Sequence, residues 1–264
     1  MLNAVYCEFL KLKKSKFYLF LLIAACFFPI VSCNNFLGTN RTVHWTSYIF
    51  QAWQFTPGFL SIPVSTLIVS YIFTKEFHFK TMSTLFCYPL SKTKVFLSKL
   101  IASGILIAFY ILFQFLLVIL IGLLLKHDEL TSQIFFGYLK INLYELFSMY
   151  AILPIGLLIS LICKNFIVPV GYSFIISLAN MYISIYILKL KTDSTGSFLY
   201  SNQDYFVTYY PMLVFQNCVK SIKTVMNISL NSVPMQISSI LIALIVFAIG
   251  IILCLLYYSK CEIK

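Results

Sequence analysis

Apolar residues in this chain form long uninterrupted runs instead of alternating with polar ones. Several runs exceed the ~18 residues that a helix needs to cross the roughly 30 Å hydrocarbon core of a bilayer. The run from Leu116 to Ile121 shows none of the two-residue alternation that is typical of strands in a membrane β-barrel. Because only helices then satisfy the backbone hydrogen bonds in lipid, the pattern predicts an all-α membrane protein.

The pattern predicts six spans within one transmembrane domain that covers residues 1–264. Two connections are long, residues 75–99 between the second and third spans and residues 189–235 before the last span. Both leave room for short helices outside the spans. The expected spans are 17–33, 56–74, 100–125, 143–163, 166–188 and 236–258.

Composition agrees with this pattern, since 61% of the 264 residues are hydrophobic and only 10% are charged, against roughly 25% in soluble domains. A water-soluble fold is therefore excluded. The net charge of +11 would suggest a nucleic-acid partner for a soluble protein. In a membrane protein, basic residues can instead mark the cytoplasmic side.

The basic residues gather on one side of the predicted membrane. With the amino terminus inside, twelve of the nineteen basic residues are cytoplasmic. Only three acidic residues are on that side, namely Glu8, Glu76 and Glu262. We therefore expect both termini in the cytoplasm and no nucleic-acid partner. The twelve are Lys11, Lys13, Lys14, Lys16, Lys75, Lys80, Lys92, Lys94, Lys99, Lys164, Lys260 and Lys264.

One alternative concerns the first span. A basic segment, an apolar stretch and the residues Ile30 to Cys33 also resemble a lipoprotein signal peptide. Cleavage there would remove the first span. An uncleaved span explains the charge asymmetry equally well and is the interpretation that we favour.

The chain lacks the residue patterns of an enzyme. It has no Gly-rich loop ending in Gly-Lys-Ser or Gly-Lys-Thr, so it is not expected to bind a nucleotide. His44 and His127 fall on the opposite side of the predicted membrane from His78, so the three histidines do not converge on a metal. We expect no catalytic, cofactor-binding or metal-binding residues in this chain.

Glu145 is the one ionisable residue inside a predicted span, a few residues from its outer end. We interpret it as an interfacial carboxylate that reaches water, with a role in transport as the alternative. Gln114 and Asn180 also lie in spans, where each is expected to form an interhelical hydrogen bond.

The first sixteen residues have an amphipathic pattern. Apolar residues recur at helical spacing from Leu2 to Leu10, whereas charged residues lie largely on the other face. Such a helix can lie along the inner headgroup layer with its lysines facing anionic lipid. The alternative is a plain basic flank of the first span. The residues that define this segment are Glu8, Phe9, Lys11, Lys13 and Lys14.

Residues 75–99 contain a second amphipathic pattern. Phe79, Met82 and Phe86 form one apolar stripe of a short helix that ends near Pro89. A short amphipathic helix between two spans suits docking into a groove of another protein. The alternative is an interfacial helix that has no partner.

The outer connection is too apolar between residues 206 and 215 for a solvated loop and too short to span. We expect it to form helices that re-enter the outer leaflet, with aromatic anchoring at the headgroups as the alternative. The residues that we single out are Tyr209, Tyr210, Pro211 and Phe215.

These features resemble the type II ABC exporter permeases, in particular the small six-span subunits of bacterial lantibiotic-immunity and bacitracin-resistance transporters. The residues from Glu8 to Lys16 are similar to the family's elbow helix, which is acidic and then basic. Lys80 stands where the family usually has glycine and Lys92 where arginine is more frequent. The signature after the second span is matched by Glu76, Thr81, Leu85, Pro89, Ser91, Lys92 and Lys99.

The resemblance implies a permease of the bacterial plasma membrane that pairs with a second copy or a sibling permease. ATP and Mg would bind to separate ABC ATPase subunits, the outer connection would form a gate, and the cargo would be amphipathic, such as an antimicrobial peptide or a lipid-like molecule. A stand-alone immunity or scaffold protein that binds a peptide without ATP is the alternative. The resemblance assigns ATPase coupling to Glu76, Phe79, Thr81, Met82, Leu85, Phe86, Pro89, Ser91 and Lys92.

Overall fold

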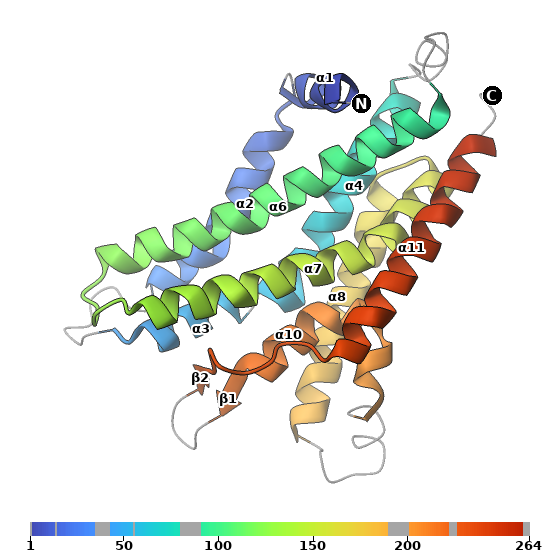
Figure 1. Cartoon of the computed structure of the whole chain (residues 1–264). Helices are drawn as coiled ribbons and strands as arrows, with labels where there is room; N and C mark the ends of the chain where they lie inside the picture. The colour runs from blue at the N-terminus through green and yellow to red at the C-terminus, as the bar shows by residue number, and fades with distance from the viewer. Residues whose placement is uncertain are drawn as a thin grey trace.

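The fold is a bundle of long helices with short elements at both ends (Figure 1). It is seen in a computed structural model, which describes residues 2–13, 15–34, 43–54, 56–79, 91–189, 201–221 and 226–260. The six long helices are α2 (Phe17–Asn34), α4 (Ser61–His78), α6 (Lys92–Leu124), α7 (Ser132–Cys163), α8 (Ile167–Lys189) and α11 (Ile237–Lys260).

Five of these helices, among the residues described, are long and apolar enough to cross a membrane: α2, α6, α7, α8 and α11. The chain is thus a multi-pass membrane protein. Helix α4 corresponds to the second predicted span but is not one of the five, because its last turns carry Lys75 and Glu76. A sixth crossing by α4 stays a prediction.

Two of the long helices start earlier than their predicted spans. Helix α6 begins at Lys92 rather than at residue 100, and α7 begins at Ser132 rather than at residue 143. An apolar run marks only the part of a helix that meets hydrocarbon, whereas the helix itself continues until a cap ends it. The Ser91 side chain provides such a cap for α6 by accepting a hydrogen bond from the Lys94 backbone amide at 3.4 Å.

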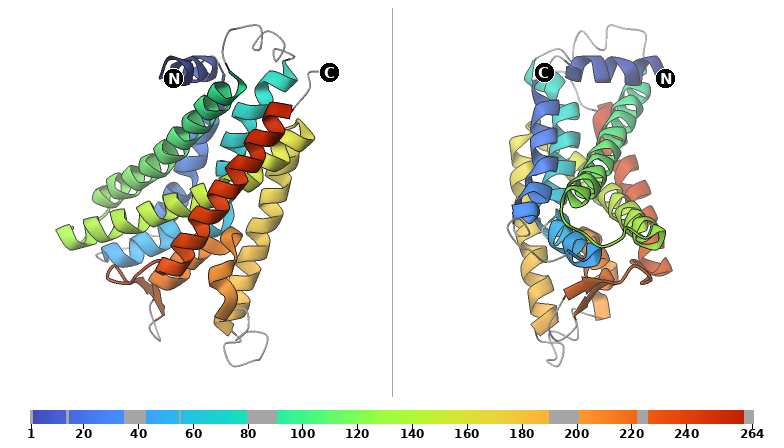
Figure 2. Two further views of the ribbon diagram at one scale, coloured as in Figure 1. Left: turned by 45° about the vertical axis from the view of Figure 1, so that its right-hand side comes forward. Right: turned by 90° about the vertical axis from the view of Figure 1, so that its left-hand side faces the viewer.

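One short helix, α1 (Leu2–Lys13), lies across the end of the bundle at which α11 finishes (Figures 1 and 2). The amino-terminal residues and the end of the last helix are therefore on the same side of the molecule. The opposite end is built from α3 (Trp45–Trp53), η1 (Thr56–Leu60), η2 (Gln203–Tyr205), η3 (Val207–Tyr209) and α10 (Tyr210–Cys218).

The sequence pattern missed three short elements at this opposite end, one helix and two strands. Helix α3 is short, and its nine residues were assigned to no element. Strands β1 (Val219–Ser221) and β2 (Met226–Ile228) form an antiparallel pair in which Val219 faces Ile228. The prediction of an all-α protein is confirmed for the architecture as a whole. This strand pair was not expected, because three-residue strands are too short to produce a recognisable alternation.

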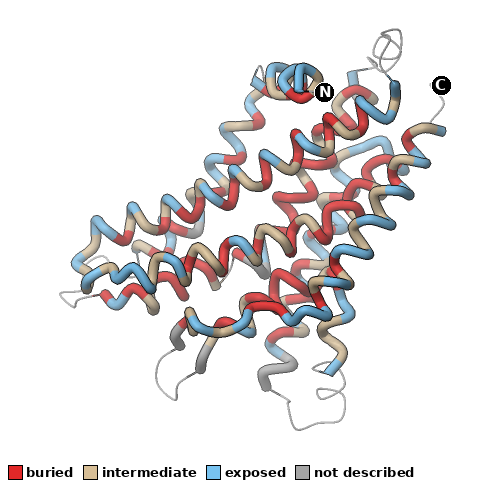
Figure 3. Tube along the Cα trace, in the orientation of Figure 1, coloured by how far each residue is buried: buried red, intermediate tan, exposed pale blue. Residues whose placement is uncertain are grey.

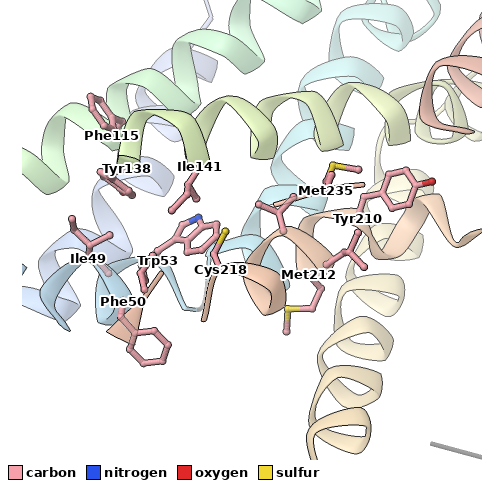
Figure 4. Close-up of a cluster of buried hydrophobic side chains, with 14 of the residues drawn as sticks. Ile49, Phe50, Trp53, Phe115, Tyr138, Ile141, Tyr210, Met212, Cys218 and Met235 are labelled. Carbon is pink, nitrogen blue, oxygen red and sulfur yellow. The ribbon is translucent and has the colours of Figure 1, made fainter. Parts of the chain in front are cut away.

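Two clusters of buried apolar side chains hold the helices together. One lies toward the end that contains α1 and includes Leu12, Phe73 and Tyr258. The other lies toward α3 and α10, where Trp53 of α3 lies near Ile141 of α7 and Phe50 points away from α7 (Figure 4). Exposed apolar side chains alternate with buried ones along the long helices, and they provide the surface that would meet lipid (Figure 3).

Glycines allow helices to approach closely at two points of the bundle. A Cβ added at Gly250 of α11 would lie 2.5 Å from the Cβ of Pro154 of α7. A Cβ added at Gly156 of α7 would lie 2.8 Å from the Cγ2 of Thr66 of α4. Small residues at helix contacts are a common source of packing in membranes, where the hydrophobic effect between helices is weak.

Gly250→Val is expected to lower the stability of the purified protein by about 1–3 kcal/mol, because the rigid proline ring cannot move out of the way. The thermal midpoint in detergent should fall accordingly. Gly171→Val is the matched control, since a Cβ at Gly171 has no atom within 4 Å and both glycines lie in long helices. Equal midpoints for the two variants would contradict the close contact between α7 and α11.

Candidate functional site

Four charged side chains from three helices meet at the end of the bundle that contains α1. Lys11 of α1 lies 2.8 Å from Glu8 Oε1 and 2.8 Å from Glu76 Oε1 of α4. Lys99 of α6 lies 3.0 Å from Glu76 Oε2 and 3.7 Å from Glu8 Oε2. Two carboxylates and two ammonium groups thus alternate in one ion network that joins α1, α4 and α6.

The network is mostly withdrawn from solvent. Lys99 is 1% exposed, Glu76 5% and Glu8 7%. The Lys99 ammonium group also donates to the Ile72 carbonyl oxygen at 3.1 Å, so it has a backbone partner in addition to the carboxylates. Removal of a charge from water is costly unless an oppositely charged partner compensates for it. The stability of each charge in the network therefore depends on its partners.

Charge pairing decides the protonation of the network. Burial by itself would lower the pKa of Lys11, but hydrogen bonds to Glu76 and Glu8 outweigh it and raise this pKa above its usual value. Burial would raise the pKa of Glu76, but Lys99 and Lys11 together hold this pKa below its usual value. Both groups are therefore charged at neutral pH.

Further contacts fix the same ends of the helices. Lys75 donates to the Lys11 carbonyl oxygen at 2.8 Å, and Lys92 at the start of α6 donates to the Ser259 carbonyl oxygen of α11 at 2.9 Å. Tyr258 of α11 packs its ring against Phe73 and Phe96, with centroids 6.3 and 5.6 Å away. The residues that flank the segment 79–91 are consequently joined to both α1 and α11.

The residues predicted to couple to an ATPase are divided by the structure. Glu76 lies in the ion network, Ser91 and Lys92 lie at the start of α6, and Phe79 follows α4 with 61% of its surface exposed. The predicted apolar stripe cannot be followed further. Thr81, Met82, Leu85, Phe86 and Pro89 lie outside the described residues.

The predicted elbow residues lie in α1, except Lys14, which is outside the described residues. Phe9 is half-buried against the inner apolar cluster, and Lys13 is exposed. The lysines of this helix were expected to face anionic lipid, but Lys11 pairs with Glu76 of α4, and Glu8 lies 3.7 Å from Lys99 of α6. Lys99 was recognised only as part of a motif, since a lysine in sequence gives no sign of the carboxylates that fold against it.

The four predicted gate residues pack tightly at the other end. Tyr209, Tyr210 and Pro211 are buried, and the Tyr210 hydroxyl donates to the Asp204 carbonyl oxygen at 2.9 Å. The ring of Phe215 lies 5.3 Å from that of Trp53. This apolar segment is thus part of a folded core and not a solvated loop.

Glu145 does not reach water, which corrects the prediction that it is an interfacial carboxylate. Its side chain is buried in α7, and the Trp53 indole N–H donates to Glu145 Oε2 at 2.6 Å. The prediction failed for two reasons. Helix α7 begins well before residue 143, so Glu145 is far from its end, and the unpredicted helix α3 covers it.

The chain is similar to known transport proteins. Residues 4–180, which include the ion network and Glu145, match the family model for the ABC-2 family transporter proteins. Over 125 residues the chain is 25% identical to the bacitracin transport permease protein BCRB of Bacillus licheniformis. The aligned part is 47% of this chain and 60% of that protein, so the chain spans about 60% of the length of the curated relative that it matches.

Proposed function

The chain belongs to the ABC-2 transporter family, and from this premise we propose that it is the permease subunit of an ATP-driven exporter. ABC-2 permeases work with ABC ATPase subunits in general, and such a subunit transports rather than catalyses. The observation that carries the proposal is the ion network, which fixes both helices that flank residues 79–91.

The proposed mechanism uses residues 79–91 as the coupling segment. An ATPase that docks on this segment would pull on the ends of α4 and α6 at the same time. Because Glu76 and Lys99 join these ends to α1 through Lys11 and Glu8, and Lys92 joins α6 to α11, the motion would reach most of the bundle. ATP binding would thereby shift the population between two access states of the permease.

The proposed cargo is an amphipathic molecule such as an antimicrobial peptide, moved outward from the membrane. The bacitracin permease that resembles this chain supports a peptide cargo. The apolar elements η3 and α10 support it as well, because an apolar outer region suits a cargo with an apolar face. In this proposal α1 and the end of α11 face the cytoplasm, and two permeases pair.

The coupling segment is testable by substitution. Met82→Ser with Phe86→Ser should reduce ATPase docking about 30-fold, since apolar anchors of an interface often contribute about 2 kcal/mol. In proteoliposomes that contain the co-expressed ATPase, peptide-stimulated ATP hydrolysis should fall to its basal rate. Membrane insertion should be unchanged.

Phe136→Ser is the matched control, because Phe136 is a phenylalanine with 64% exposure at the opposite end of the bundle. Peptide export and ATP hydrolysis that survive the double substitution would remove the coupling assignment. Peptide protection by the wild-type chain without any ATPase would favour the stand-alone immunity protein instead.

A further inference from the structure

The interior of the bundle contains a carboxyl group that is only half satisfied. Glu145 Oε2 accepts the hydrogen bond from Trp53, but Oε1 is buried and has no hydrogen-bond partner among the described residues. The whole side chain is 2% exposed. A buried polar atom without a partner costs free energy, so its presence in a membrane-spanning helix needs an explanation.

A pocket lies between α4, α6 and α7, one turn along α7 from Glu145. It is lined by Ser61 and Ser65 of α4, by Tyr110 of α6 and by Met149, which follows Glu145 by one turn on the same face of α7. The Tyr110 hydroxyl is also buried without a hydrogen-bond partner among the described residues. In this conformation the pocket is too narrow to hold water.

A purely structural role does not explain an acid at this position. The Trp53 indole needs only one acceptor, which an amide oxygen would provide without the cost of a buried ionisable group. Glu145 Oε1 and the Tyr110 hydroxyl are two unsatisfied oxygens that can accept hydrogen bonds, and Tyr110 lines the pocket. The pocket residues include no basic side chain that pairs with them.

We propose that Glu145 binds a cationic group of the transported molecule, an ammonium group in the simplest case, in the pocket between α4, α6 and α7. An ammonium group has three donors, which suit Glu145 Oε1, the Tyr110 hydroxyl and the serine hydroxyls of α4. Ile68, Ile107 and Ile111 give the pocket apolar walls that suit the carbon chain behind such a group. The proposal rests on the proposed transport function and names the chemistry of its cargo.

The ion pair would form only when the pocket opens. In the closed bundle the pocket has no room for such a group. When the helices separate, the ammonium group enters and pairs with the Glu145 carboxylate. Charge attraction in these apolar surroundings is stronger than in water, so one charge can select the cargo.

The chain provides its own reporter for this site. It contains two tryptophans, so Trp45→Phe leaves Trp53 as the single indole, and Trp53 contacts Glu145 directly. The probe is an apolar peptide with blocked termini and one lysine, and its twin carries the same lysine acetylated. Full-length protein in lipid nanodiscs is titrated with each peptide while Trp53 fluorescence is recorded.

The lysine peptide should change Trp53 fluorescence saturably and bind at least tenfold more tightly than its acetylated twin. Glu145→Gln keeps an acceptor for Trp53, so it should fold normally but lose the difference between the peptides. Equal binding of the two peptides to the protein with Glu145 intact would overturn the proposal, whatever the variant does.

The cation site and the proposed transport function can fail independently of each other. If Glu145→Gln discriminates between the peptides as well as the unsubstituted protein does, the cation site is wrong, while ATP-dependent export can still be measured with the same proteoliposomes. If the wild type shows no ATP-dependent export, the proposed function fails even where Trp53 reports binding.

Discussion

Lys99→Met is expected to destabilise the protein by about 3–5 kcal/mol, because it leaves two buried carboxylates with one ammonium group. Lys99 is 1% exposed and pairs with Glu76 at 3.0 Å. The side-chain volume is nearly kept, so the loss measures charge and not packing. The thermal midpoint of the purified protein in detergent, followed by size-exclusion chromatography, would report it.

Two variants separate this charge effect from other causes. Lys94→Met changes an exposed lysine of the same helix and should alter the midpoint little. Glu76→Gln combined with Lys99→Met removes one charge of each sign and leaves the Lys11 and Glu8 pair, so it should recover much of the loss. A double variant as unstable as Lys99→Met alone would show that Glu76 and Lys99 are not coupled.

Trp53→Ala is expected to cost about 3–5 kcal/mol, the range for removing a large buried aromatic side chain. Trp53 is 2% exposed, and its ring packs 5.3 Å from that of Phe215. The substitution also leaves Glu145 without its hydrogen-bond donor. The same thermal assay should therefore show a loss as large as that of Lys99→Met, at the opposite end of the bundle.

Trp53→Phe distinguishes the two parts of this effect. Phenylalanine keeps most of the aromatic volume but has no N–H, so the remaining loss should be about 1–3 kcal/mol, the cost of one unsatisfied buried group. Adding Glu145→Leu to Trp53→Phe should relieve that part. If Trp53→Phe is as stable as the wild type, the hydrogen bond to Glu145 does not contribute to the fold.

The ion network and the pocket lie at different positions along the bundle. The ion network joins the ends of α1, α4 and α6 beside the segment 79–91, where an ATPase is proposed to act. The pocket lined by Tyr110 and Met149 lies farther along α4, α6 and α7, where cargo is proposed to bind. Helices α4 and α6 take part in both, so a displacement of their ends would alter the pocket.

Composition and periodicity were sufficient for the coarse architecture of the chain. A membrane helix must satisfy its own backbone hydrogen bonds, so about 20 consecutive apolar residues determine a long helix almost without reference to the rest of the chain. The predicted span 17–33 accordingly matches α2, and the predicted span 166–188 matches α8. The motif residues after the second span were likewise sufficient to indicate the permease family.

The tertiary structure decided which polar groups pair with one another between the helices. Lys99 and Glu76 are 23 positions apart in the sequence, and Glu8 is farther still, so nothing local shows that their charges meet. Glu145 was misjudged for the same reason: a carboxyl near the end of an apolar run looks solvated until α3 is seen to cover it. Hydrophobicity along a chain fixes which segments enter the membrane, whereas the partners of a polar group depend on which helices pack against it.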